Sequence, residues 1–425
     1  MIPHVDTLIL GGGLTGLSTA YHLQQLGYTD YLVVEREQEP GGLCRSFQKE
    51  GFTFDYSGHL LHLHTPYGKK FVKTLLKNNL RRIKRESWVY LQNRWIPFPI
   101  QANLYALPCA ISHLCAEELL QKGPSTKPHS LKAWCISSFG AGLYKHFFRP
   151  YNTKLWGISP ARLTCDWCGA FIPRPTRQEV LRSLTKKPAK AWGYNTYFLY
   201  PKTGGAGALI QALTKQIRYL RLHASVTQID LNSKTARING TLFRFNKLVN
   251  TLPLPQFLQL LKNAPELRKL ALALKAAPVL VYQVAVKGKG KKFSWIYFPD
   301  KKDPFFRVGQ QSSFSPENAP KGCRSFYIEL PGNLRPTKTL EKQIWNSLLQ
   351  KGIITEYDEK LFSFWQKLPT AYALYDFKRA SVVQAVLSKL EKQACYLAGR
   401  YGKWEYSFME TSILQGREIA KKLIG

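Results

Sequence analysis

Three glycines near the amino terminus have the spacing that allows a backbone turn to hold a pyrophosphate. They are Gly11, Gly13 and Gly16, and they follow an apolar run over residues 7–10. The first glycine permits a tight bend, the second lets the backbone approach the phosphates, and the third lets a strand and a helix pack closely. The positive end of the following helix then faces the phosphates. The pattern predicts a dinucleotide-binding turn.

The elements around this turn form a β-α-β unit. Residues 17–26 have the pattern of a helix that ends at Gly27, and residues 31–34 form a second apolar strand. Glu35 stands at the end of that strand, where a carboxylate accepts hydrogen bonds from ribose hydroxyls. Because a negative charge there would repel a 2′-phosphate, we expect a dinucleotide without that group.

A second cluster of phosphate-binding character follows the second strand. Gly41 and Gly42 expose backbone N–H groups, and Arg45 adds a permanent cation. Together with the first glycine turn, this segment resembles the FAD signature of the amine-oxidase superfamily, which includes protoporphyrinogen oxidase, phytoene desaturase and UDP-galactopyranose mutase. The resemblance implies that FAD is the cofactor.

Two later stretches resemble the other parts of this superfamily's FAD domain. A strand near Val226 would lie beside the adenine, and the segment from Gly399 to Met409 resembles the closing flavin motif, in which the last helix points at the flavin. The resemblance implies a set of cofactor-binding residues: Gly11, Gly13, Leu14, Thr15, Gly16, Glu35, Arg36, Gly42, Leu43, Arg45, Gly58, His59, Val226, Gly399, Arg400, Met409 and Ser412.

Further motifs are similar to the mutase branch of the superfamily. Tyr151 precedes a Lys-x-Trp motif that ends at Trp156, and His59 and His62 are spaced H-x-x-H. Phe408 stands where the mutase usually has an acid, and the surrounding stretch is more similar to protoporphyrinogen oxidase-like members. The resemblance therefore covers a mutase-like and an oxidase-like branch.

The resemblance to the mutase also implies a site for a diphosphate. Arg307, Tyr372 and Tyr406 match its phosphate-binding positions, and either Arg174 or Arg177 would supply a second arginine. Arginines bind phosphate oxygens bidentately, and tyrosine hydroxyls donate to the remaining oxygens. The implied catalytic residues are His59, Tyr151, Trp156, Arg174, Arg177, Arg307, Tyr372 and Tyr406.

The order of the motifs predicts an α/β protein with a discontinuous cofactor domain. Residues 1–68, 198–256 and 386–425 would assemble a Rossmann-type FAD-binding domain of the glutathione reductase-like kind. Residues 69–197 form a helical insertion, rich in aromatic residues, on the substrate side. Residues 257–385 contain alternating stretches that predict an antiparallel-sheet substrate domain.

Composition limits the partners. The chain has 425 residues and a net charge of +34, which favours anionic partners in general. The basic residues lie in scattered short runs, so we expect no specific nucleic acid but an anionic small molecule, with peripheral association with an anionic membrane as a further expectation. No stretch has the length of a membrane span and no secretory signal is visible, which predicts a cytoplasmic location. The eight cysteines suggest neither a disulfide framework nor a metal site.

Two activities follow from the resemblance. The first is an FAD-dependent enzyme that acts on a nucleotide-activated sugar through the flavin N5 atom, in surface polysaccharide biosynthesis. The alternative is an FAD-dependent oxidase or desaturase that removes hydride from an apolar substrate, such as a porphyrinogen, an amine or a polyene. A flavin-binding protein without catalysis is a third reading. The substrate, the reductant and the oligomeric state are left open.

Overall fold

A parallel sheet assembled from separate stretches of the chain forms one layer of the fold. The computed structural model describes residues 2–121, 128–185, 192–193 and 195–425. In this sheet β9 (Leu220–Arg221), β2 (Tyr31–Val34), β1 (His4–Leu10) and β12 (Thr241–Asn250) lie in that order, and β18 (Cys395–Leu397) pairs with the far side of β12. β1 is buried along most of its length, as expected for a strand covered on both faces.

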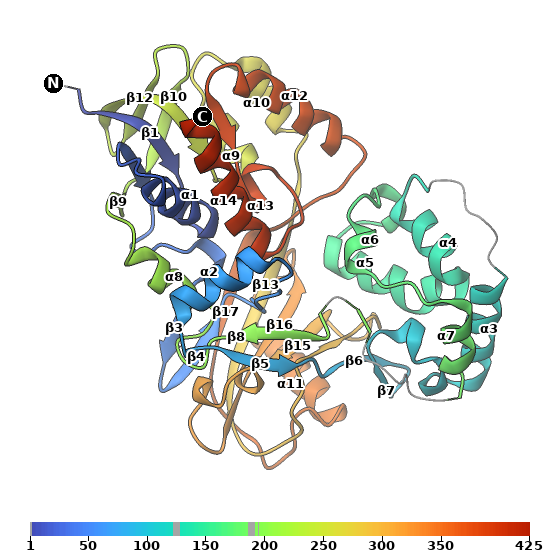
Figure 1. Cartoon of the computed structure of the whole chain (residues 1–425). Helices are drawn as coiled ribbons and strands as arrows, with labels where there is room; N and C mark the ends of the chain where they lie inside the picture. The colour runs from blue at the N-terminus through green and yellow to red at the C-terminus, as the bar shows by residue number, and fades with distance from the viewer. Residues whose placement is uncertain (1, 122–127, 186–191, 194) are drawn as a thin grey trace.

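Helices cover both faces of this sheet (Figure 1). On one face α1 (Leu14–Gln25) packs against α14 (Met409–Ile424), the last helix of the chain. On the other face lie α9 (Leu254–Leu260), α10 (Pro265–Ala271) and α12 (Arg379–Glu391), which share one hydrophobic core with Leu8 and Leu10. Antiparallel strands β10 (Val226–Asp230) and β11 (Thr235–Ile238) extend the sheet beyond β12.

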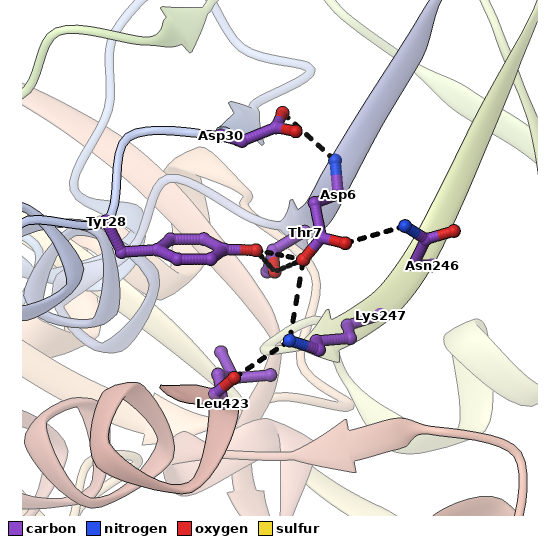
Figure 2. Close-up of polar contacts among 7 residues, drawn as sticks. All are labelled: Asp6, Thr7, Tyr28, Asp30, Asn246, Lys247 and Leu423. Carbon is purple, nitrogen blue, oxygen red and sulfur yellow. Dashed lines mark hydrogen bonds and ion pairs between the residues drawn. The ribbon is translucent and has the colours of Figure 1, made fainter. Parts of the chain in front are cut away.

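Polar side chains join three separate stretches of this domain near the start of β1 (Figure 2). The Asp6 carboxylate accepts hydrogen bonds from the Tyr28 hydroxyl and, at 2.6 Å, from the Asn246 amide. The Lys247 ammonium lies 3.5 Å from the same carboxylate and donates at 2.8 Å to the carbonyl of Leu423 in α14. The cluster ties β1, the loop after α1, β12 and the last helix together.

A second, seven-stranded sheet forms the substrate-side layer. Its order is β17 (Glu359–Ala373), β13 (Ala276–Lys287), β16 (Cys323–Pro331), β15 (Arg307–Gln310), β14 (Trp295–Tyr297), β6 (Ser87–Leu91) and β7 (Arg94–Pro97). All pairs are antiparallel except β14 with β6. One face packs on α11 (Lys338–Gln350). Two of these strands, β6 and β7, come from the stretch at 69–197 that was expected to be helical.

From residue 109 on, the helices of that stretch form a helical unit at one side of the molecule (Figure 1). It contains α3 (Cys109–Leu120), α4 (Leu131–Leu143), the π-helical η4 (Tyr144–Phe148), α5 (Arg149–Trp156), α6 (Cys168–Phe171) and α7 (Arg177–Ser183). These helices share a separate core with Val89 and Ile96 of β6 and β7.

Short elements connect the layers. They are β3 (Ser46–Lys49) with β4 (Phe52–Asp55), β5 (Arg81–Lys84) with β8 (Tyr197–Tyr200), α2 (Pro66–Leu76), α8 (Gly207–Thr214) and α13 (Gly399–Gly402). The predicted boundaries at 68 and 256 fall inside α2 and α9. The predicted fold class, a discontinuous Rossmann-type domain with a helical insertion and an antiparallel-sheet domain, is confirmed. Within the described ranges, no helix is both long and apolar enough to cross a bilayer.

Candidate active site

A cavity of about 690 Å³ opens between the parallel sheet, the second sheet and the helical unit, since all three supply residues to its lining. This volume falls within the range of small-molecule and cofactor sites, roughly 300–1,000 Å³. Three groups of residues line it in succession: the glycine turn of β1 and α1, the start of α14, and an arginine and tyrosine cluster on the second sheet.

The glycine turn leaves backbone exposed where a phosphate could approach. Gly11 has φ +97°, and a Cβ at Gly16 would lie 2.0 Å from the carbonyl oxygen of Gly11, so these two glycines serve the turn and its packing. A Cβ at Gly13 would meet no atom within 4 Å. No side chain caps the N-terminus of α1 and no acid lies in its first turn, so the positive end of the helix is available to an anion.

Glu35 and the second glycine pair lie beside this turn. The Glu35 carboxylate accepts from the Gly12 N–H at 2.9 Å, which fixes its orientation at the cavity wall. The Gly41 N–H donates to the Gly12 carbonyl at 2.7 Å, and Arg45 donates to the Gly42 carbonyl at 3.0 Å. The two phosphate-binding segments that the sequence predicted therefore lie against each other.

The C-terminal segment closes on the same turn. Gly399 has φ +80°, and a Cβ there would lie 2.4 Å from the Thr15 hydroxyl oxygen. Arg400 donates to the carbonyls of Ser407 (3.0 Å) and Ala371 (3.2 Å), so its charge faces the cavity held by backbone groups. Of the predicted cofactor residues, these line the cavity: Gly11, Gly13, Leu14, Thr15, Glu35, Arg36, Gly42, Leu43, Arg45, Gly58, His59, Val226, Gly399, Arg400, Met409 and Ser412.

His59 lies between the cofactor side and the substrate side. Its Nδ1 atom is buried and has no hydrogen-bond partner among the described residues. Burial, and then the charge of Arg400, lower the pKa of His59 to about 4, so the ring is neutral at neutral pH. A buried polar atom without a partner on a cavity wall fits a site that a polar ligand completes.

Arg307 forms the charged centre of the substrate side. It donates to the Glu329 carboxylate through Nε and, at 2.7 Å, through Nη2, and Nη2 also lies 3.4 Å from the Tyr372 hydroxyl. Ser57 donates to the same carboxylate. Burial acts to lower the pKa of Arg307, but the Glu329 charge outweighs it and raises the pKa well above its ordinary value.

Tyrosines surround the ion pair of Arg307 and Glu329. The rings of Tyr372 and Tyr406 stack at 5.8 Å, and the Arg400 guanidinium lies 5.1 Å and 4.9 Å from their centroids. Tyr151, from α5, packs edge-on against Tyr297 at 5.3 Å. Burial raises the pKa of Tyr151 and of Tyr372, so both hydroxyls keep their protons and can donate hydrogen bonds.

Three predicted catalytic residues do not line the cavity. Trp156 is buried in the core of the helical unit, where its ring packs against Tyr372 from behind. Arg174 is exposed, with its guanidinium 4.9 Å from the Trp134 ring, and Arg177 is the exposed first residue of α7. Gly16 does not line the cavity either; it packs against Gly11 behind the turn, in the packing role that the sequence predicts for the third glycine.

Four residues of the lining were not predicted from the sequence. Glu329, Tyr297, Tyr327 and Ser57 all face the cavity. Glu329 was visible as the one acid inside the apolar run of residues 326–330, and an acid in a buried strand is rarely there without a partner. The other three carry no such signal in the sequence.

Comparisons with known proteins agree with this architecture. Residues 9–76 match the family model described as NAD(P)-binding Rossmann-like domain. A crystal structure of reduced UDP-galactopyranose mutase superposes with a TM-score of 0.94 at 27% identity, over 99% of this chain and 96% of that one. A redesigned putrescine oxidase superposes with a TM-score of 0.67 at 13% identity, over 100% and 99% of the two chains.

The family-model match and the superposition on UDP-galactopyranose mutase support the resemblance to the FAD-dependent amine-oxidase superfamily. The open face of Gly13, the uncapped start of α1 and the unpartnered Nδ1 atom of His59 fit the FAD that the resemblance implies. A protein of Klebsiella pneumoniae named "Probable UDP-galactopyranose mutase" is 24% identical over 170 residues, which are 37% of this chain and 42% of that protein. The chain thus spans less than half the length of this curated relative in the alignment.

Proposed function

We propose that this FAD-dependent protein is an enzyme that acts on a nucleotide-activated sugar, as a mutase-like isomerase. The observation that carries the proposal is Arg307, which Glu329 and the Tyr372 hydroxyl hold at the wall of the cavity that also contains the FAD-binding turn. A fixed guanidinium beside protonated tyrosines is suited to a diphosphate. The likeness of the whole chain to reduced UDP-galactopyranose mutase supports the same substrate class.

The residues of this chain would bind and orient the substrate. FAD, when bound, supplies a ring whose N5 atom is the reactive centre. Arg307 and Arg400 provide cations that keep their charge as a diphosphate separates from a sugar, which is electrostatic stabilisation by groups already in place. Tyr151 and Tyr372 hold protons that they can donate to phosphate oxygens, because burial raises the pKa of each hydroxyl.

An anaerobic turnover assay tests the proposal. The holoprotein is reduced with dithionite and incubated with UDP-galactopyranose and a panel of other UDP-sugars, and the nucleotide sugars are then separated by chromatography. The proposal predicts a product isomeric with its substrate, formed without net oxidation. Absence of turnover and of binding across the panel, by a protein that holds reducible FAD, would contradict it.

An aromatic region of the same cavity favours the second candidate, an oxidase or desaturase with an apolar substrate. Phe171 lies 4.7 Å from Phe408 and 4.7 Å from Tyr406 between ring centroids, and all three line the cavity. Such a surface binds an apolar group without hydrogen bonds. Reduction of the oxidised flavin by a porphyrinogen or an amine, measured without oxygen, would select this activity.

A further inference from the structure

Two stretches of the chain that lack acidic residues meet on one surface of the molecule. Residues 56–85 contain eight Lys and Arg and no Asp or Glu, and residues 197–229 contain four Lys and Arg and no Asp or Glu. The first stretch holds α2 and β5, and the second holds β8 and α8. Because a net charge of +34 need not be concentrated anywhere, two stretches without acidic residues depart from an even distribution of charge.

The structure brings the two stretches together. α2 packs against α8, and β5 pairs with β8 in an antiparallel ribbon. Asn79, after α2, donates to the Thr203 carbonyl at 3.1 Å and accepts from the Thr203 N–H at 2.9 Å. Figure 1 shows α2, α8, β5 and β8 as neighbours on the side facing the viewer.

Lysines on this surface point to solvent. α2 buries Phe71, Val72 and Leu76, so its charged residues are confined to the opposite side of the helix. We call the resulting surface the α2–α8 basic face. Its exposed members are Lys69, Lys70, Lys73 and Lys77 on and just after α2, with Lys202 and Lys215 flanking α8.

The ribbon extends the face and adds an aromatic residue to it. Arg82 and Lys84 are both exposed, and the Arg82 guanidinium lies 4.0 Å from the ring centroid of Tyr197, which is 45% exposed. Among the ion pairs of the described residues, the one formed by these two stretches joins Arg81 to Glu317 at 3.5 Å. The six lysines of the basic face form none within the same ranges.

A hollow lies between the two helices. It has a volume of about 590 Å³, and its lining includes Lys77, Lys215, Asn79 and Gly204. Two ammonium groups and an amide at the wall of an open hollow can receive a phosphate-bearing headgroup.

We propose that the α2–α8 basic face docks this protein on an anionic phospholipid membrane. The lysine ammonium is a point charge that needs no fixed partner geometry, so it suits a fluid layer of lipid headgroups. Nucleic-acid sites rely more on the arginine guanidinium, which binds phosphates through two nitrogen atoms. The exposed Tyr197 has the amphipathic character of residues that lie at membrane–water interfaces. Docking here is independent of the reaction in the cavity.

Vesicle sedimentation tests this proposal with the full-length holoprotein. Vesicles of phosphatidylcholine alone are compared with vesicles that also contain phosphatidylglycerol, at low and at high salt. We expect binding only to the anionic vesicles and its loss at high salt, because a Debye length shortens as salt rises. Retention on neutral vesicles, or no binding to anionic vesicles at low salt, would overturn the proposal.

Matched charge variants locate the surface. A variant with Lys69→Gln, Lys73→Gln and Lys77→Gln should bind anionic vesicles on the order of 100-fold more weakly, since each lysine contributes roughly five-fold. The control, Lys321→Gln, Lys338→Gln and Lys342→Gln, removes the same charge from exposed positions before β16 and in α11, and it should bind like the unchanged protein. Equal loss in both variants would overturn the assignment to this face.

A competition arm separates a membrane from a nucleic acid. Duplex DNA is added to the protein with and without anionic vesicles. Flavin absorbance in the pellet reports the holoprotein bound to vesicles, and the mobility shift of the DNA in the vesicle-free samples reports DNA binding. We expect vesicle binding by the unchanged protein to exceed DNA binding at the same salt. DNA binding that depends on Lys69, Lys73 and Lys77, with no vesicle binding, would overturn the proposal in favour of a nucleic-acid surface.

Discussion

Arg307 and Glu329 face each other directly across β15 and β16, and the guanidinium of the first binds the carboxylate of the second through two nitrogen atoms. The side chain of Glu329 is 2% exposed and that of Arg307 is 21% exposed. Adjacent strands therefore hold the charge of the arginine at the cavity wall, and the acid orients it rather than leaving it to solvent.

Removal of the acid should destabilise the fold. We expect Glu329→Gln to lower the free energy of unfolding by about 3 kcal/mol, because it leaves a largely buried guanidinium without its countercharge. The control is Glu359→Gln, which breaks the exposed pair with Lys287 (3.4 Å) and should cost less than about 0.5 kcal/mol. Denaturant unfolding measures both, and equal effects would show that the buried pair has no special role.

Removal of Arg307 should lower the rate of the proposed reaction without lowering the amount of bound FAD. We expect Arg307→Gln to lower kcat/KM for a nucleotide sugar about 100-fold, the size of effect seen when a preorganised charged donor is lost. FAD content, read from the visible absorbance, should not change. The double variant Arg307→Gln with Glu329→Gln should regain stability without regaining activity; recovery of activity would mean that Arg307 acts only in the fold.

Two glycines of the first turn should respond differently to substitution. Gly13 has φ −72°, and a Cβ there meets no atom, so Gly13→Val should leave the apoprotein fold intact but weaken FAD binding at least about ten-fold. Gly16→Ala brings a Cβ within 2.0 Å of the Gly11 carbonyl oxygen and should destabilise the fold itself. Thermal unfolding of the apoproteins and FAD titration separate the two effects. Tight FAD binding by the Gly13 variant would place the cofactor elsewhere.

Much of the cofactor half could be predicted from the sequence because its chemistry is local. Gly11, Gly13 and Gly16 lie within six residues, and their spacing has one physical reading when a strand precedes it. The substrate half depends on contacts between distant residues. Ser57 donates to Glu329, which is 272 positions later in the sequence, and no local sequence pattern predicts that contact.

The residues that lie outside the cavity show a second limit. Resemblance to a motif gives the position of Trp156, Arg174 and Arg177 in the chain but not the direction of their side chains. Trp156 lies in the hydrophobic core of the helical unit, where its indole N–H donates to the Asn152 side chain at 3.2 Å, one helical turn earlier. The pairing of β6 with β14 was also not predicted, because the paired residues are about two hundred positions apart in the sequence. The contact between Ser57 and Glu329 was missed for the same reason.

The fall in stability at acid pH should depend on the polar cluster near the start of β1. Burial acts to raise the pKa of Asp6, but hydrogen bonds from Tyr28 and Asn246 and the charge of Lys247 lower it overall. A lowered pKa means that the stabilisation is present above the ordinary pKa of 3.8 and is lost as pH falls through the folded value. We expect Asp6→Asn to lower Tm near neutral pH and to flatten its fall in acid; an unchanged acid limb would contradict this.

The same cluster should also make the melting temperature fall at alkaline pH. Burial and the hydrogen bond to Asp6 raise the pKa of Tyr28 to about 12 from its ordinary 10.0. The stabilisation is therefore complete below pH 10 and is lost as pH rises toward 12. Tyr28→Phe should remove this part of the Tm profile, and a Phe variant whose alkaline fall matches that of the parent would show that other groups cause it.

Titration of the photoreduced holoprotein with UDP, without oxygen, tests the central claim most directly. If a nucleoside diphosphate binds between Arg307 and Tyr372 beside the flavin, the flavin absorbance should change in a saturable way, and Arg307→Gln should abolish the change while Arg174→Gln preserves it. The account would be contradicted if the flavin absorbance spectrum does not change at any UDP concentration while a porphyrinogen or an amine reduces the oxidised flavin of the same protein.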